Sequence, residues 1–517
     1  MPRPKAPGTP GWGPVLLALV MASAGGFRLS QLDGLAPFID EAADLLLSVD
    51  YQNWDVGSRL LHGKLLGYLW FKPVYLVAWD PLYAARLVCA LTGVLVVWVV
   101  YRLLRTQVEY PAALAGTALM ALLPITIFHD RMALFEGFVT LGIVAAVLLY
   151  LESGRERPLM LFLAGALLCA AVLTKGYAVL GVAVWLPVLR RRFAGSGGWK
   201  GLLSVLLGAT ASVLVAGVFL VSELSQGSGN LQAAFQAPGR FLAIDLGIGQ
   251  RAALALEQLA QIFQYLWGYN GWAFVAVLLF AAVLPGRRWR FRLELVAACC
   301  LYGVVLSVAL RFLFSRYLLV MLPALALLVA LAIEDCLDRM GGRVRPVKSA
   351  WPALVLLLVL TGCLAGFLYR DTRIAAQSLE GILPDRDAYQ YVWGAPSGFG
   401  LREIADELAR LETEDQRKLV CLTRGMGTGT HGAATLPLIL RHRPVRFVHL
   451  WMQSEDDFRI VRGLSRQARV VVFEDEPGFV DERMKSGLEA DLRLLSEVKG
   501  RVGRPDYRLY EVVPRNR

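Results

Sequence analysis

Apolar runs of roughly 20 residues, separated by polar segments, follow one another along the chain up to residue 370. A helix of this length can cross the hydrocarbon core of a bilayer. We count eleven runs, near residues 11–30, 81–104, 110–128, 133–151, 158–174, 176–189, 201–222, 271–285, 293–311, 317–335 and 350–369. The pattern therefore predicts an α-helical polytopic membrane protein with about eleven transmembrane helices.

The pattern changes after residue 370. Amphipathic, helix-like segments alternate there with short segments rich in β-branched and aromatic residues. The helix-like segments are Leu401–Leu411, Glu455–Leu464 and Val480–Leu488, and the strand-like segments are Leu419–Leu422, Val445–His449, Val470–Phe473 and Tyr507–Val513. Such alternation is typical of a small α/β domain. We therefore expect a transmembrane domain over residues 1–370 and an α/β domain over residues 371–517.

Two connections between the runs, residues 31–80 and 223–270, are longer than simple loops. Within them, residues 42–80 and 231–268 contain apolar stretches that charged residues interrupt, together with several Trp and Tyr side chains. Interrupted apolar faces and aromatic side chains are typical of helices that lie in the membrane interface. We therefore expect interfacial helices in both connections.

The first run has two interpretations. Ala22-Ser23-Ala24 fits the cleavage site of a secretory signal peptide. We favour an uncleaved span, because the later spans alternate across the membrane only if the first one also crosses it.

The charges of the chain indicate its orientation. The net charge is +11, but residues 371–517 contain 23 basic and 23 acidic side chains, so the basic excess lies between the apolar runs. It occupies alternate connections: the amino terminus and residues 102–105, 152–157, 190–200, 287–292 and 339–348. By the positive-inside rule these are cytoplasmic. The other connections and residues 371–517 then lie outside the cytoplasm, as in a multi-pass protein of the inner membrane, and nucleic acid is not expected as a partner.

The cysteines and glycines give no cofactor site. The seven cysteines show neither a disulfide framework nor the spacing of metal ligands, and six of them lie in or beside apolar runs. The glycines within residues 425–429 lack the lysine that follows in a phosphate-binding loop.

Asp40 and Glu41 follow the first span on the outer side. In a structural interpretation, Asp40 caps a short helix, where free N–H groups and the helix dipole favour an acid. In a chemical interpretation, a partly desolvated carboxylate at the membrane surface accepts a proton from a hydroxyl nucleophile. Adjacent side chains on a helix diverge by about 100°, so one acid could act as the base while the other orients a substrate or a cation.

Asp130, Arg131 and Glu136 lie where the third and fourth runs meet. Asp130 and Arg131 could form a solvated turn. Glu136 lies about one turn inside an apolar helix, where an ionised side chain is costly and usually faces a partner or a wet cavity. Glu136 is therefore the more informative acid.

Isolated basic residues occur at the outer ends of other runs: Lys175, Arg311 and Arg316. Long basic side chains can reach lipid headgroups from such positions. The positive-inside rule makes basic residues less common on the outer side, however. Several together therefore indicate a site for an anionic group such as a lipid phosphate.

The order of several segments resembles the GT-C glycosyltransferases of the protein O-mannosyltransferase and aminoarabinose transferase type. The segments are Asp40-Glu41, Lys72-Pro73-Val74-Tyr75, Pro81 to Leu87, Arg131-x-x-x-x-Glu136, Leu173-Thr174-Lys175-Gly176 and Ser315-Arg316-Tyr317-Leu318-Leu319. The resemblance covers residues 1–370. Two features depart from the family pattern: the Arg131 element ends in Glu where Asp is more common, and a Pro-Pro pair before the aromatic stretch is absent.

The resemblance implies a GT-C fold and a glycosyltransferase activity. The donor would be a sugar linked to polyprenyl phosphate. The acceptor would be a hydroxyl or phosphate group of an envelope glycan, lipid or protein, and transfer would take place outside the cytoplasm with inversion at the sugar. A divalent metal ion is a candidate cofactor, since it could bridge a phosphate and acidic side chains.

The resemblance also implies roles for individual residues. Asp40 would be the catalytic base, with Glu41 and Glu136 as supporting acids. The residues expected at the substrate are Lys175 and Arg316, which would contact the donor phosphate, and Asp130, Arg131, Arg311 and Tyr317.

Two other functions stay open. A lipid-linked glycan transporter or flippase would have charges near the bilayer midplane and an internal repeat, whereas the charges of this chain gather at one side. A polysaccharide-assembly scaffold would need no catalytic acids.

Overall fold

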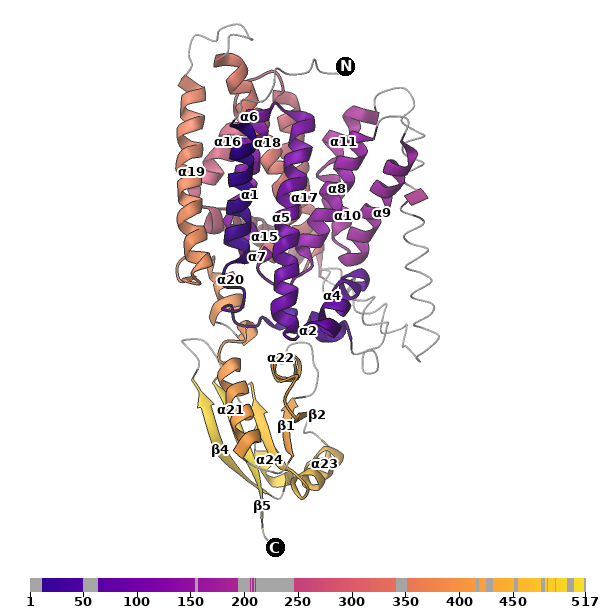
Figure 1. The fold of residues 1–517 in the computed structure, drawn as a ribbon, viewed down its shortest axis with the longest axis vertical. Helices are drawn as coiled ribbons and strands as arrows, with labels where there is room; N and C mark the ends of the chain where they lie inside the picture. Colours follow the sequence, from indigo (N-terminus) through magenta and orange to yellow (C-terminus); the bar gives the residue numbers. More distant parts are fainter. Residues whose placement is uncertain are drawn as a thin grey trace. The chain divides into compact units, whose positions relative to one another are not determined.

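The computed structural model describes residues 12–49, 64–153, 157–193, 246–340, 351–393, 395–414, 418–424, 431–450, 454–475, 479–480, 482–488, 490–499 and 506–515, together with residues 205, 207, 208 and 210. The chain forms two compact units (Figure 1). The helical unit comprises the residues up to Leu32, those from Asp50 to Trp70 and those from Ala85 to Pro384. The α/β unit comprises Asp33–Val49, Phe71–Ala84 and the residues from Asp385 onward.

Most of the apolar runs form helices. They are α1 (Gly13–Leu29), α5 (Pro81–Gln107), α6 (Tyr110–Ala121), α7 (Pro124–Asp130), α8 (Glu136–Glu152), α9 (Pro158–Thr174), α10 (Ala178–Ala183), α11 (Leu186–Phe193), α16 (Trp272–Val283), α17 (Trp289–Ala309), α18 (Leu322–Met340) and α19 (Trp351–Ala375). The run expected at 201–222 lies almost entirely outside the described residues. The boundary expected at residue 370 falls inside α19, which continues to Ala375.

The apolar runs predict eleven membrane spans. Among the described residues, three helices are long and apolar enough to cross a membrane: α5, α17 and the part of α19 from Leu354 to Ala375. Two bent pairs, α6 with α7 and α15 (Ile248–Asn270) with α16, raise the number to five if each pair is one span. The expected eleven spans are therefore not confirmed.

Two backbone features explain the bends. The chain bends by 54° between α6 and α7, where Pro124 begins the second helix. Proline has no amide hydrogen to donate to the preceding turn. The bend of 114° between α15 and α16 contains Gly271, whose φ of 78° is a conformation that side chains with a Cβ rarely adopt.

The helix α18 forms the centre of the helical unit. All its residues from Leu322 to Cys336 are buried, and it packs against α6, α16, α17 and α19. A helix that is apolar on every side is typical of such a central position. On α6, a Cβ at Gly116 would lie 3.0 Å from the carbonyl oxygen of Ala326. The absence of a side chain at Gly116 therefore lets the two helices approach closely.

The long connections contain three described helices. They are α2 (Ile39–Leu47) and α4 (Leu65–Val77) in the first connection and α15 in the second. Helix α4 exposes Leu69, Trp70, Leu76 and Val77, which is the kind of surface that an interfacial helix presents to lipid. The placement of these helices in the interface stays a prediction.

The α/β unit contains a five-stranded sheet. The strands are β1 (Leu419–Arg424), β2 (Val445–Leu450), β3 (Arg469–Glu474), β4 (Ala490–Val498) and β5 (Tyr507–Pro514), in the order β2-β1-β3-β5-β4. Strand β1 pairs in parallel with β2 and β3, and β5 pairs antiparallel with β3 and β4. Strand β4 and the helix α22 (His431–Ile439) are absent from the sequence-based expectations.

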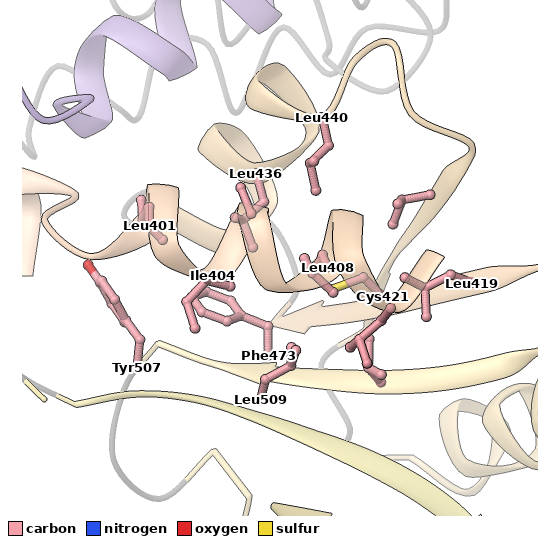
Figure 2. Close-up of a cluster of buried hydrophobic side chains, with 14 residues drawn as sticks. Leu401, Ile404, Leu408, Leu419, Cys421, Leu436, Leu440, Phe473, Tyr507 and Leu509 are labelled. Atoms are coloured by element: carbon pink, nitrogen blue, oxygen red, sulfur yellow. The ribbon is translucent and has the colours of Figure 1, made fainter. Parts of the chain in front are cut away.

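Helices cover both faces of the sheet. Figure 2 shows the cluster that α21 (Leu401–Glu414) and α22 form with one face. The helices α23 (Glu455–Ser465) and α24 (Glu482–Leu488) pack on the other. In β3, Val471 and Phe473 belong to the first cluster and Val470 and Val472 to the second. Successive side chains of a strand point to opposite faces, so both faces of β3 are buried.

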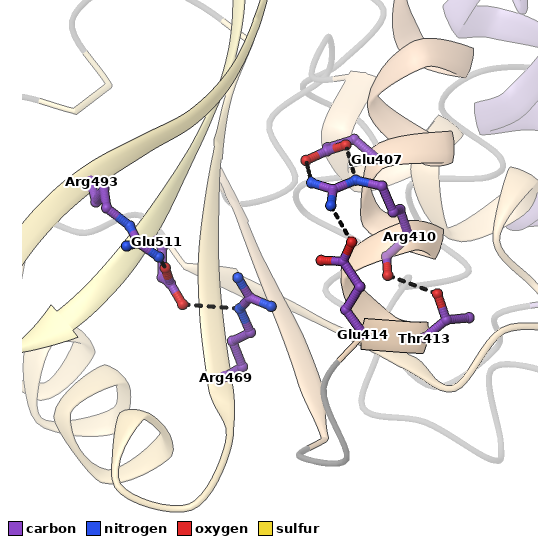
Figure 3. A network of polar contacts seen from close by, with 7 residues as sticks. All are labelled: Glu407, Arg410, Thr413, Glu414, Arg469, Arg493 and Glu511. Atoms are coloured by element: carbon purple, nitrogen blue, oxygen red, sulfur yellow. Dashed lines mark hydrogen bonds and ion pairs between the residues drawn. The ribbon is translucent and has the colours of Figure 1, made fainter.

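One acidic side chain links neighbouring strands of the sheet through two arginines (Figure 3). Glu511 of β5 accepts a hydrogen bond from Arg469 Nε of β3 at 2.9 Å and forms an ion pair with Arg493 of β4. It therefore links three neighbouring strands.

Candidate active site

Glu136, Lys175 and Arg316 form a buried ionic cluster in the helical unit. Glu136 Oε1 accepts a hydrogen bond from Lys175 Nζ and lies 3.3 Å from Arg316 Nε. All three side chains are at most 8% exposed. One carboxylate is thus buried together with two basic groups, and each buried charge depends on partners of opposite sign.

The α8–α9 pair places two members of this cluster. Glu136 is the first residue of α8, and Lys175 follows the last residue of α9 with an extended backbone. The two helices lie side by side (Figure 1), and a Cβ at Gly142 would lie 3.1 Å from that of Ala171. An acid at a helix amino terminus and a base at a carboxyl terminus both interact favourably with the helix dipoles.

Arg316 reaches the cluster from a short 3₁₀ helix, η1 (Ser315–Val320), which packs on α7 and α8. His129 of α7 holds the beginning of η1, because its Nε2 lies 2.9 Å from Ser315 Oγ. His129 was not among the expected site residues. Its position beside Asp130 and Arg131 was visible in the sequence, but its partner Ser315 lies far away along the chain.

Aromatic rings border the two basic groups. The rings of Tyr177 and Tyr317 lie 4.8 Å apart, and Lys175 Nζ is 5.9 Å from the ring of Tyr317. The guanidinium group of Arg316 lies 4.7 Å from the ring of Phe314 and 5.9 Å from that of Tyr317. Such cation–π contacts stabilise a cation without removing its charge. Tyr317 belongs to the cluster because its ring lies close to both basic groups.

Asp130 has a different partner, Arg28 of α1. Arg28 Nε donates to Asp130 Oδ2 at 2.8 Å. The same guanidinium donates to the carbonyl oxygen of Ala121 and to Thr126 Oγ1. Arg28 is absent from the residues expected at the site. A lone arginine inside an apolar run is nevertheless a signal, because burying its charge costs free energy unless an acidic or polar group pairs with it. Asp130 is therefore a buried acid and not part of a solvated turn.

Arg131 is surrounded by backbone oxygens. Its guanidinium donates to the carbonyl oxygens of Ile374, Ser30 and Gln31, and the residue is fully buried. These bonds join the end of α7 to the ends of α1 and α19. The solvated turn considered for Arg131 is therefore wrong, and its contribution to substrate binding stays a prediction.

Arg311 lies between α17 and η1. Its backbone oxygen and that of Leu310 both accept a hydrogen bond from Gln258 Nε2 at 3.1 Å. This bond ties the segment before η1 to α15. The expected role of the Arg311 side chain at the substrate stays a prediction.

Asp40 and Glu41 belong to the α/β unit. Helix α2 begins at Ile39, with Phe38 as its N-cap residue. Glu41, in the third helical position, is fully buried, and its Oε2 accepts a hydrogen bond from Phe38 N at 3.0 Å. Asp40 is therefore not the N-cap residue, because the N-cap, Phe38, lies two residues earlier and Glu41 reaches back to its N–H group. Asp40 is half-buried.

The candidate metal has no visible ligand set in the part of the chain that the structure describes. No three His, Cys, Asp or Glu side chains there are grouped so that they could hold a metal ion. The metal stays a prediction.

Comparison with known proteins places this geometry in context. Residues 56–221, which include Glu136 and Lys175, match the family model described as dolichyl-phosphate-mannose-protein mannosyltransferase. No curated protein sequence matches the chain. The solved structures of ArnT from Cupriavidus metallidurans, bound to undecaprenyl phosphate and in the apo state, are similar with TM-scores of 0.54 and 0.56.

The likeness to ArnT extends over almost the whole chain. Both comparisons cover 97% of this chain and 98% of ArnT, with 14% and 15% sequence identity. At this identity the likeness shows the fold. The chain thus has the GT-C membrane fold with a small C-terminal sheet. Together with the family model, the fold confirms the resemblance to GT-C glycosyltransferases of the protein O-mannosyltransferase and aminoarabinose transferase type, and the enzyme class of the protein is that of a membrane glycosyltransferase.

Proposed function

We propose that the protein transfers a sugar from a polyprenyl-phosphate-linked donor to a hydroxyl or phosphate group of an envelope glycan, lipid or protein. The observation that carries this proposal is the buried cluster of Glu136, Lys175 and Arg316. Its two fixed cations can hold a phosphate through charge-assisted hydrogen bonds. An ArnT of the same fold has been solved with undecaprenyl phosphate, a lipid phosphate of this class.

The two cations would also assist the reaction. When the bond between the sugar and the phosphate breaks, negative charge grows on the departing lipid phosphate. Lys175 and Arg316 are held in place before this happens, so they stabilise the charge without reorganisation. Glu136 fixes both basic side chains through its shared oxygen and is a supporting acid in this sense.

Asp40 is the proposed catalytic base. It would take the proton of the acceptor as the acceptor attacks the anomeric carbon, which gives inversion in a single displacement. Its carboxylate is partly buried, and the neighbouring Glu41 accepts the hydrogen bond from the N-cap residue Phe38. Negative charge near the sugar ring also favours the oxocarbenium-like transition state.

The reaction is proposed to take place on the outer face of the cytoplasmic membrane. The basic excess between alternate apolar runs supports this orientation. In this arrangement the helical unit contains the transmembrane part, and the α/β unit, which includes Asp40, lies outside the cytoplasm.

The test combines a binding and a product measurement. Purified Lys175→Ala and Arg316→Ala variants are expected to bind undecaprenyl phosphate about 10-fold to 100-fold more weakly than the wild type, since each loses a charge-assisted hydrogen bond worth about 1.5–3 kcal/mol. Arg102→Ala is the control, because Arg102 forms an exposed ion pair with Glu152 and exposed pairs contribute little.

Mass spectrometry of envelope glycans from cells with and without the gene then identifies the product. A missing sugar in the cells without the gene supports transfer. Unchanged binding in both variants, or unaltered glycans with lipid-linked precursors held on one side of the membrane, would contradict transfer and favour a flippase.

A further inference from the structure

The helix that carries Asp40 cannot be stable by itself. Helix α2 has nine residues, and isolated helices shorter than about 12 residues are marginal in water. It buries Ala42 and Leu45 completely and packs against α22 of the C-terminal sheet domain. The conformation of α2 therefore depends on residues that lie nearly 400 positions later in the chain.

A second set of contacts holds the residues before α2. The glycine Gly398 has a φ of 64°, and a Cβ there would lie 2.1 Å from the carbonyl oxygen of Pro37. The rings of Phe38 and Tyr391 meet edge to face with centroids 4.8 Å apart. Arg402, at the beginning of α21, donates to the carbonyl oxygen of Asp33. Tyr391, Gly398 and Arg402 thus contact the chain between Asp33 and Phe38 at three points.

A third set of contacts holds Tyr75 and Trp79, near the end of the first long connection (residues 31–80). His442 stacks on Trp79 with ring centroids 3.8 Å apart, and its Nε2 lies 2.9 Å from the carbonyl oxygen of Trp79. Arg441 donates to the carbonyl oxygen of Tyr75 and lies over the Tyr75 ring. Residues near both ends of the connection 31–80 therefore contact C-terminal residues: α22, Tyr391, Gly398 and Arg402 at the first end, and Arg441 and His442 at the second.

We propose that the C-terminal α/β domain sets the position of α2, and that Gly398 and Tyr391 are positioning residues that act through Asp40. The proposal rests on the function proposed above in one respect, the role of Asp40 as the base. A base must lie within hydrogen-bonding reach of the proton it takes, and small displacements of a reacting group cost large factors in rate. The domain therefore contributes to the catalytic step without touching the donor phosphate.

The first experiment measures α2 directly. Hydrogen exchange of the backbone amides is followed by mass spectrometry in the purified full-length protein, for wild type, Gly398→Ala and Gly381→Ala. Gly381 is the matched control, because its φ of 69° imposes the same backbone strain while a Cβ there would meet nothing within 4 Å. We expect the amides of residues 39–47 to exchange at least roughly 10-fold faster in Gly398→Ala only.

The amides of β1 and β3 show whether the sheet is still folded. Unchanged protection of β1 and β3 with faster exchange in α2 supports the proposal, whereas unchanged exchange in α2 overturns it. If Gly398→Ala unfolds the sheet, Tyr391→Ala and Tyr391→Phe decide the question. The phenylalanine keeps the ring that meets Phe38, so exchange in α2 should rise in Tyr391→Ala alone, and equal exchange in both variants overturns the proposal.

The second experiment separates positioning from simple folding. With a polyprenyl-phosphate sugar as donor, kcat should fall at least roughly 10-fold in Tyr391→Ala and recover in Tyr391→Phe. The KM for the donor should stay unchanged, because the lipid phosphate is held elsewhere. A rise in KM with constant kcat overturns the positioning role. Since hydrogen exchange does not depend on activity, the attachment of α2 can be established even if Asp40 proves not to be the base.

Discussion

Glu136 Oε1 accepts a hydrogen bond from the Lys175 ammonium group where α8 begins and α9 ends, and the same oxygen forms an ion pair with the Arg316 guanidinium group. Removing one member of such a buried group leaves a charge without its partner, which typically costs about 3–5 kcal/mol. Removing the acid alone leaves two bases without their shared partner, whereas removing the acid and one base together leaves only one. The cluster therefore couples three distant parts of the chain energetically.

This coupling predicts a non-additive result for Glu136→Gln and Lys175→Met. We expect each single variant to unfold at a clearly lower temperature than the wild type, and the double variant to lose less stability than the sum of the two. The coupling energy should be about 0.5–3 kcal/mol. Thermal unfolding in detergent measures it, and strictly additive losses would show that the two side chains do not interact.

Asp40→Asn tests the proposed base. Asparagine has nearly the shape of aspartate but cannot take a proton at working pH, and general-base catalysis typically contributes about 10²–10⁴-fold. We expect normal expression, stability and undecaprenyl phosphate binding, with transfer reduced at least about 100-fold. Asp80→Asn is the control, since Asp80 accepts a hydrogen bond from Tyr83 N at the beginning of α5. Near-normal turnover of Asp40→Asn would exclude Asp40 as the base.

Arg131→Lys distinguishes a structural role from a phosphate contact. A lysine cannot reproduce the planar fork that reaches three carbonyl oxygens. We expect a loss of stability of about 1–3 kcal/mol, visible as a lower unfolding temperature, with unchanged binding of undecaprenyl phosphate. Weaker binding at unchanged stability would instead support the substrate-binding role that the sequence suggested.

Thiol labelling reports on the α/β unit. Burial raises the pKa of the Cys421 thiol, and its side chain is fully covered by the core in Figure 2. Because the thiolate is the reactive form, we expect maleimide to leave Cys421 unmodified until denaturant unfolds the sheet. Peptide mass spectrometry identifies the labelled cysteine. Rapid modification of Cys421 in the native protein would contradict this packing.

Reporter fusions test the orientation. A reporter that is active only outside the cytoplasm should be active when fused after Pro384, which follows α19, and inactive when fused at Arg345, between α18 and α19. The reason is the basic excess in residues 339–348. The reverse pattern would place the C-terminal domain in the cytoplasm and exclude the proposed outer site.

Several features could be predicted from the sequence because they depend on local pattern. The apolar runs that the structure describes became helices, and the β-rich segments at Leu419, Val445 and Val470 became β1, β2 and β3. Strand β4 was missed because its residues alternate irregularly and several are charged, so it lacks the apolar pattern of a buried strand. The number of spans stays a prediction, and hydropathy does not show where the chain bends at Pro124 or Gly271.

The site was predictable only in part. Glu136 and Lys175 attracted attention because charged residues are costly beside apolar runs, and their pairing follows from the packing of neighbouring helices. The partner of Asp130 could not be inferred, since Arg28 lies 102 positions earlier in the chain. For the same reason the attachment of Pro37 to Gly398 was invisible, because no local pattern encodes a contact across 361 residues.

The composition of the α/β unit has a consequence for biosynthesis. Its first segment ends at Val49 and its main part begins at Asp385. At the usual rate of synthesis of about 5–20 residues per second, the ribosome needs on the order of 20 to 70 seconds to make the residues between them. Helix α2, which carries Asp40, therefore cannot pack in its final position until the last part of the chain has been translated. If Asp40 is the base, as proposed, a nascent or truncated chain that is already inserted would lack a positioned base and would not transfer sugar.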